Sequence, residues 1–155
     1  MKVKQATGGK WMPQVCETPA AAAGQAGVRS VAPFGYQLLL DLYDCKKGVA
    51  DDLGLCYEFL EQIVKVLKVE PQSPPFIFRT DGSRYPDKAG LSGWIPLVES
   101  GIQIHTLTPK DFISIDIYSC RKFENAPVKE FVRAYFSPKR MDQQFLERGL
   151  DYHKA

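Results

Sequence analysis

Four side chains with reactive groups lie close together in the sequence: Ser92, Ser100, His105 and Cys120. Ser100 follows Glu99 and precedes a glycine, where the surrounding pattern predicts the tip of a β-hairpin. A serine hydroxyl at such a tip can attack the carbonyl of its own preceding peptide bond and convert that amide into an ester. Loss of the serine α-proton then eliminates the upstream chain and leaves a pyruvoyl group on the downstream chain.

This self-cleavage needs an accessible turn, a hydrogen-bond donor near the oxyanion and a base near the α-carbon. Ser92 and His105 are the candidates for donor and base. A pyruvoyl ketone condenses with a substrate amine and withdraws electrons during decarboxylation, as pyridoxal does. A positioned acid must then reprotonate the carbanion, and Cys120 is the candidate. We therefore expect cleavage between Glu99 and Ser100, and a small amino-acid-type substrate.

Alternation with a period of two residues places these groups on one face of the predicted hairpin. One set of alternate positions is apolar: Ile102, Ile104, Ile113, Ile115 and Ile117. The other set is polar or reactive: Gln103, His105, Ser114, Asp116, Tyr118 and Cys120. We therefore expect one apolar face and one face that carries every reactive group.

The rest of the chain is predicted to form the elements that position this hairpin. Residues 49–69 carry apolar side chains three or four apart, the pattern of an amphipathic helix, and a second helix is predicted over residues 126–136. Strands are predicted over residues 35–45 and 75–80, with a possible edge strand over residues 143–146. These elements predict an α+β two-layer sandwich, in which both helices cover the apolar face of an antiparallel sheet.

The reactive face of that sheet needs a cover of its own. A second copy of the sheet packed against it would supply one, so we predict a homodimer that forms sheet to sheet. Residues 1–33 follow no apolar period and include an alanine run and several glycines and prolines. They are predicted to be a poorly ordered extension of a domain that spans residues 34–155.

The composition excludes several classes of protein. The 155 residues are 45% hydrophobic, which suits one compact domain. The formal charge is only +2, so no nucleic-acid partner is expected. No apolar stretch approaches the ~20 residues of a membrane span, and the N-terminus lacks a secretory pattern, so we expect a cytoplasmic protein. The four cysteines include no C-x-x-C pair, so neither a disulfide framework nor a metal site is expected.

These residues resemble those of the S-adenosylmethionine decarboxylase family in its short bacterial and archaeal form. The resemblance covers about residues 36–152 and rests on L-x-D-L-Y-x-C ending at Cys45, R-Y at Tyr85, G-L-S-G at Ser92, E-S at Ser100, I-H-T at His105, and Cys120 fifteen residues later. It implies that Ser100 becomes the pyruvoyl cofactor, that Ser92 and His105 assist processing, and that Cys120 protonates the product. It also implies a four-stranded antiparallel sheet with two helices, dimerising through the sheets.

Departures from the family lie on the substrate side. Gly101 follows the reactive serine where the family usually has histidine, and Lys110 stands where a glutamate usually binds the ribose hydroxyls. Lysine cannot accept hydrogen bonds from a diol. Tyr85 is expected to replace the loop aromatic that stacks on adenine, and Asp41 replaces a strand glutamate. Asp111, next to Lys110, is a further candidate for substrate binding.

Three hypotheses follow for the function. The resemblance implies decarboxylation of S-adenosylmethionine for spermidine synthesis. A second hypothesis is the same chemistry on L-arginine or L-ornithine, with Asp41, Asp87, Asp111 or Asp116 binding the cationic side chain. A third, from a different class, is a paralogue that never cleaves and binds a catalytic partner. Because all four processing and protonation residues are present, we rank a decarboxylase first, with S-adenosylmethionine ahead among the substrates.

Overall fold

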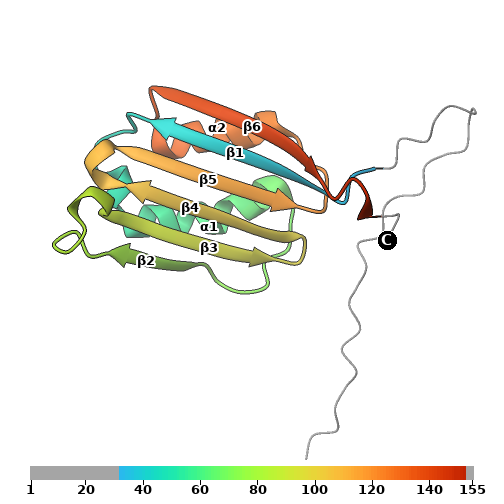
Figure 1. Ribbon diagram of the computed structural model, residues 1–155, viewed down its shortest axis with the longest axis horizontal. Helices are drawn as coiled ribbons and strands as arrows, with labels where there is room; N and C mark the ends of the chain where they lie inside the picture. The colour runs from blue at the N-terminus through green and yellow to red at the C-terminus, as the bar shows by residue number, and fades with distance from the viewer. Residues whose placement is uncertain (1–31, 153–155) are drawn as a thin grey trace, which may run out of the picture.

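The computed structural model describes residues 32–152, which form one antiparallel sheet with two α-helices on one of its faces (Figure 1). The strands are β1 (Gly35–Tyr43), β2 (Phe76–Thr80), β3 (Gly90–Leu97), β4 (Ser100–Leu107), β5 (Phe112–Ser119) and β6 (Arg140–Arg148). The helices are α1 (Leu53–Leu67) and α2 (Asn125–Phe136), with short 3-10 helices η1 (Val49–Asp51), η2 (Pro86–Lys88) and η3 (Thr108–Lys110). The strand order is β2-β3-β4-β5-β1-β6.

The predicted α+β sandwich is confirmed, but the predicted count of four strands was wrong, because the sheet has six. The largest difference lies in β6, which was expected only as a possible edge strand over residues 143–146. It pairs with β1 over nine residues, from Gly35↔Arg148 to Tyr43↔Arg140. Nearly all of its side chains are exposed, so its sequence shows no apolar alternation from which its length could be predicted.

The helix predicted over residues 49–69 is divided into η1 and α1. Asp52 separates them as the N-cap of α1, where its carboxylate accepts a hydrogen bond from the Leu55 N–H at 2.9 Å. Such a bond satisfies one of the backbone donors that the first turn of a helix leaves open. The other helix was predicted to begin at residue 126, and α2 begins one residue earlier.

The apolar core lies between the sheet and the two helices. The predicted apolar face is confirmed, because its five isoleucines on β4 and β5 are all fully buried. Phe59 of α1 is also fully buried, and its ring centroid lies 4.8 Å from that of Phe136 on α2. Burying an aromatic side chain of this size contributes about 1.5 to 3 kcal/mol. These contacts hold both helices against the same face of the sheet.

Thr106 is a polar exception on the buried face. Its side chain is fully buried, and its hydroxyl oxygen accepts a hydrogen bond from the Leu91 N–H at 2.8 Å. The same hydroxyl donates to the carbonyl oxygen of Ala50 at 2.6 Å. One side chain therefore ties η1 to the beginning of β3 and satisfies two buried backbone groups.

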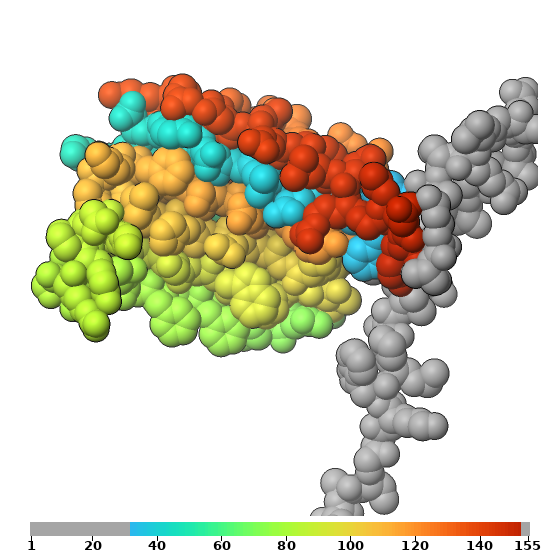
Figure 2. Space-filling view, viewed as in Figure 1, coloured from blue at the N-terminus to red at the C-terminus, as the bar shows by residue number. Residues whose placement is uncertain are grey.

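Because α1 and α2 lie behind the sheet in the view of Figure 1, the described residues leave the opposite face open to view in Figure 2. We call this surface the open face. Among residues 32–152, no helix is both long and apolar enough to span a bilayer. The extension predicted over residues 1–33 lies, as far as residue 31, outside the described residues.

Candidate active site

One pair of predicted site residues lies on the open face near the end of the sheet at which β4 turns into β5. Ser92 on β3 is directly opposite His105 on β4, and the serine Oγ is 2.9 Å from the histidine Nδ1. The same row continues across the sheet through Ser114 on β5 to Asp41 on β1. The alternation of the strands therefore turns a serine, a histidine and a carboxylate toward the same side.

The predicted cleavage site lies at the other end of β4, where β3 turns into β4. Ser100 is the first residue of β4 and has a φ of +137°. Residues other than glycine rarely adopt such a backbone conformation, which costs about 1 to 3 kcal/mol when the surrounding structure imposes it. The bond between Glu99 and Ser100 is thus next to a strained residue.

The carbonyl group of that bond already has a hydrogen-bond donor. The backbone N–H of Cys120, which follows the last residue of β5, donates to the carbonyl oxygen of Glu99 at 2.9 Å. This is the carbonyl that the Ser100 hydroxyl would attack. Residue types alone did not predict this donor, because every residue except proline carries a backbone N–H.

The structure therefore brings the four predicted residues together as two pairs. Ser92 lies with His105, and Cys120 lies with the Glu99–Ser100 bond. Ser100 and His105 are five positions apart in β4, which corresponds to roughly 16 Å along a strand. Within the described chain, neither member of the first pair reaches the cleavage site.

A hollow of about 310 Å³ on the open face adjoins Ser100. It is lined by Gln37, Trp94, Ser100, Gly101, Gln103, Asp116 and Tyr118. A β-carbon at position 101 would lie 2.6 Å from the Trp94 Nε1, closer than such atoms approach in proteins. The glycine after the reactive serine therefore leaves room for an indole beside the cleavage site.

Asp116 gives this hollow an unusual carboxyl group. Burial raises the pKa of Asp116 above its ordinary value, and the charge of nearby Asp41 raises it further. Both effects disfavour the charged form. A cationic group bound beside Asp116 would favour the charged carboxylate and lower its pKa.

The remaining candidates for substrate binding lie toward the His105 end. Tyr85 precedes η2 and is 41% exposed, and Lys110 is the exposed last residue of η3. Asp111 is already engaged, because its carboxylate is 3.2 Å from the Lys47 Nζ. None of these three lines the hollow beside Ser100.

The described cysteines fall into two kinds. Cys45 and Cys56 are buried, and burial raises their pKa values to about 11 and about 12. Their thiols are therefore protonated at neutral pH and poor nucleophiles. Cys120 is only partly buried.

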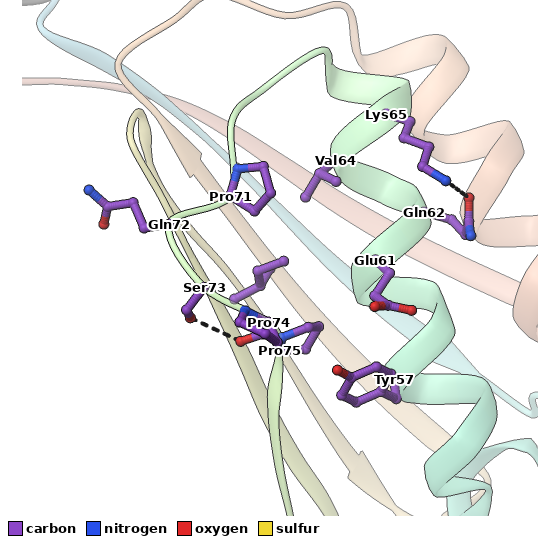
Figure 3. A pocket seen from close by; sticks show the side chains of 11 residues that line it. Tyr57, Glu61, Gln62, Val64, Lys65, Pro71, Gln72, Ser73, Pro74 and Pro75 are labelled. Atoms are coloured by element: carbon purple, nitrogen blue, oxygen red, sulfur yellow. Dashed lines mark hydrogen bonds between the residues drawn. The ribbon is translucent and has the colours of Figure 1, made fainter.

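Another hollow, of about 560 Å³, lies away from this face. It is bounded by α1 and by residues 71–75, and Figure 3 shows Tyr57 and Val64 of the helix pointing toward that segment. None of Ser92, Ser100, His105 and Cys120 lines it.

Comparisons with known proteins identify the family of the chain. The sequence matches the family model described as S-adenosylmethionine decarboxylase over residues 36–149. It is similar to the S-adenosylmethionine decarboxylase proenzyme of Persephonella marina, with 33% identity over 123 residues, covering 78% of this chain and 87% of the relative. It is also similar to the proenzyme of that name from Aquifex aeolicus, with 29% identity over 119 residues, covering 76% of this chain and 82% of the relative.

A solved structure is similar as well. The crystal structure of the adenosylmethionine decarboxylase from Aquifex aeolicus superposes with a TM-score of 0.65 at 27% identity. The superposition covers 77% of this chain and 93% of that one.

Proposed function

The chain belongs to the S-adenosylmethionine decarboxylase family, and we propose that it cleaves itself between Glu99 and Ser100 to make its own pyruvoyl cofactor. It decarboxylates S-adenosylmethionine, and this reaction serves spermidine synthesis. Its relatives carry the name proenzyme, which supports a chain that must be processed before it acts.

The proposed cleavage begins with attack of the Ser100 Oγ on the carbonyl carbon of Glu99. Negative charge then develops on the carbonyl oxygen that already accepts the Cys120 N–H at 2.9 Å, and this contact is the observation that carries the proposal. A preorganised donor to an oxyanion is worth about 3 kcal/mol of barrier. The carbon–nitrogen bond breaks, the Ser100 nitrogen takes a proton, and an ester remains. The twisted backbone at Ser100 favours this step, because breaking the amide releases its strain.

The second stage removes the α-proton of Ser100 and expels Glu99 as a carboxylate. Water then hydrolyses the remaining dehydroalanine to a ketone and ammonia. This stage needs a base near the α-carbon, and His105 is the candidate, held by its 2.9 Å contact with Ser92. Because both lie roughly 16 Å away in the same chain, the base must come from elsewhere.

We propose that a second copy supplies it. A two-fold axis lying between two facing sheets and perpendicular to their strands exchanges the two ends of the open face. Ser92 and His105 of one copy then stand over Ser100 and Cys120 of the other. Exposed apolar side chains on β2 and β3 support the packing: Phe76, Phe78 and Trp94 are 48% to 69% exposed. Apolar groups gathered on one surface mark an interaction site.

Co-expression of two defective chains tests this arrangement. A Ser100→Ala chain keeps His105, and a His105→Ala chain keeps Ser100, so a mixed dimer contains one complete site. We expect the His105→Ala chain, identified by its tag on a denaturing gel, to be cleaved only in the mixture. The matched control pairs it with a chain carrying both substitutions and should show no cleavage. Equal cleavage in mixture and control would refute a shared site.

After processing, the pyruvoyl ketone supplies the electron sink for loss of carbon dioxide. We propose that the residues around the hollow beside Ser100 hold the substrate and that the Cys120 thiol returns a proton to its α-carbon. Release of labelled carbon dioxide from S-adenosylmethionine, L-arginine and L-ornithine, each supplied separately, tests the substrate. We expect release from S-adenosylmethionine. Release only from an amino acid with a cationic side chain would overturn this assignment and favour Asp116 as its partner.

A further inference from the structure

A short segment between α1 and β2 is hydrogen-bonded to the end of β3, immediately before the cleavage site. We call residues 70–72 the strap. The Val98 N–H donates to the Glu70 carbonyl oxygen at 2.9 Å, and the Gln72 N–H donates to the Pro96 carbonyl oxygen at 2.9 Å. Between these two bonds, Pro71 forms an isolated bridge with Leu97. The strap therefore fixes the last residues that precede the proposed scissile bond.

The strap also binds the side chain of Glu99. The Glu99 Oε2 accepts a hydrogen bond from the Glu70 N–H at 3.1 Å. The main chain of Glu99 is held from the other side, through the bond from the Cys120 N–H to its carbonyl oxygen. Glu99 is thus attached to the strap by its side chain and to the end of β5 by its carbonyl group.

We propose that Glu99 is a positioning residue for self-cleavage, whose carboxylate holds the scissile peptide group in place. Rotation of the Glu99 main chain would turn the planar peptide group between Glu99 and Ser100 and remove its oxygen from the Cys120 N–H. The bond from the side chain to the strap resists that rotation, so the carbonyl carbon stays in place for the Ser100 hydroxyl. The inference rests on the proposed self-cleavage and explains why a glutamate precedes the reactive serine.

This role ends when the chain is cut. Glu99 then becomes the last residue of the upstream fragment and is no longer bonded to the reacting group. Substitution of Glu99 should therefore change the rate of cleavage and leave the decarboxylation rate per pyruvoyl group unchanged. A residue needed only for folding would change both rates together with the midpoint of thermal unfolding.

Three substitutions of Glu99 distinguish the effect of its hydrogen bond on cleavage from the effect of its charge. Glu99→Ala removes the acceptor, Glu99→Asp makes the side chain one methylene too short, and Glu99→Gln keeps a carbonyl oxygen at the same reach. We expect Glu99→Ala and Glu99→Asp to cleave about 10- to 100-fold more slowly, the usual effect of a misplaced reacting group, and Glu99→Gln to cleave within a few-fold of wild type. Glu61→Ala, which removes an exposed carboxylate from α1, is the matched control.

The experiment follows freshly translated chains on denaturing gels and adds hydroxylamine to half of each sample. Hydroxylamine cuts esters and spares amides, so it reports the first step without the elimination. We expect less hydroxylamine-dependent cutting in Glu99→Ala than in wild type. A wild-type rate of cleavage in Glu99→Ala would overturn the inference. A Glu99→Gln chain as slow as Glu99→Ala, together with a fast Glu99→Asp chain, would overturn it as well. A wild-type chain that never cleaves would overturn the proposed function itself.

Discussion

Cys120 is expected to act twice, once through its backbone and once through its thiol. Cys120→Ala keeps the N–H that the Glu99 carbonyl accepts, so this variant should still cleave itself. It lacks the proposed proton donor, so decarboxylation should fall ~100-fold or more. Cys120→Pro removes the N–H and should stop cleavage.

Gel analysis of processing and release of labelled carbon dioxide per pyruvoyl group measure the two roles separately. Far-ultraviolet circular dichroism checks that both variants keep the sheet. Full decarboxylation by Cys120→Ala would show that the thiol is not the proton donor. Normal cleavage of a folded Cys120→Pro chain would show that the backbone donor is dispensable.

Asp116 should make stability depend on pH. Its raised pKa means that the folded protein binds this proton more tightly than the unfolded chain does. The charged carboxylate therefore destabilises the folded state above its folded pKa, and the penalty disappears as the pH falls through that pKa toward the ordinary value. Asp116→Asn should raise the midpoint of thermal unfolding at pH 7.5, with a gain that shrinks toward pH 4.

The same unfolding experiment includes two further variants. Asp41→Asn removes the second cause of the raised pKa of Asp116 and should give a smaller gain of the same sign. Asp87→Asn changes an exposed acid on η2 and serves as the control. A gain for Asp116→Asn that grows as the pH falls would contradict the assigned cause.

At the scale of elements, Thr106 is expected to join η1 to β3. Thr106→Val keeps the shape of the side chain but leaves the Leu91 N–H without its acceptor and the Ala50 carbonyl with only a longer contact, 3.4 Å to the Thr108 Oγ1. Burying such unpaired groups costs about 1 to 3 kcal/mol. Thr106→Ser keeps the hydroxyl and loses only a methyl group, at about 0.8 kcal/mol.

Urea unfolding of the uncleaved Ser100→Ala chain, monitored by circular dichroism, measures these differences without interference from processing. We expect Thr106→Val to be less stable than Thr106→Ser. The opposite order would mean that packing of the two valine methyl groups outweighs both hydrogen bonds.

The elements differ in how well the sequence predicts them. The isoleucines of β4 and β5 alternate strictly, so both the buried face and the open face could be predicted. In β6 the backbone pairs with β1 while the side chains stay exposed, so no apolar pattern marks its full length. The boundary between η1 and α1 depends on the cap at Asp52, which a stripe of apolar residues does not reveal.

The candidate site was predictable in its residues and not in its assembly. The types and spacing of Ser92, Ser100, His105 and Cys120 are readable in the sequence. Their separation into two pairs follows from the length of β4, and their proposed reunion requires a second copy of the chain. The contacts that hold Glu99 come from backbone groups, which carry no signature in residue types.

At the scale of the whole molecule, cleavage should leave two fragments that stay together. The upstream fragment, residues 1–99, contains β1, β2 and β3, and the downstream fragment contains β4, β5 and β6. In the sheet, β4 and β5 lie between β3 and β1, with β6 on the far side of β1. Three of the five strand pairings therefore join different fragments.

We expect the processed protein to elute from a sizing column as one species and to separate into two bands only in denaturant. The uncleaved Ser100→Ala chain is the control for the size of the intact assembly. Loss of either fragment from the processed species under native conditions would contradict this strand order.

The contact between Trp94 and Gly101 makes these two positions interdependent. A β-carbon at position 101 would lie 2.6 Å from the Trp94 Nε1, so any larger residue there requires the half-exposed indole to move. Both residues line the hollow beside Ser100, so a substitution of Gly101 also displaces a second part of its wall. The effects of substitutions at the two positions should therefore not be additive.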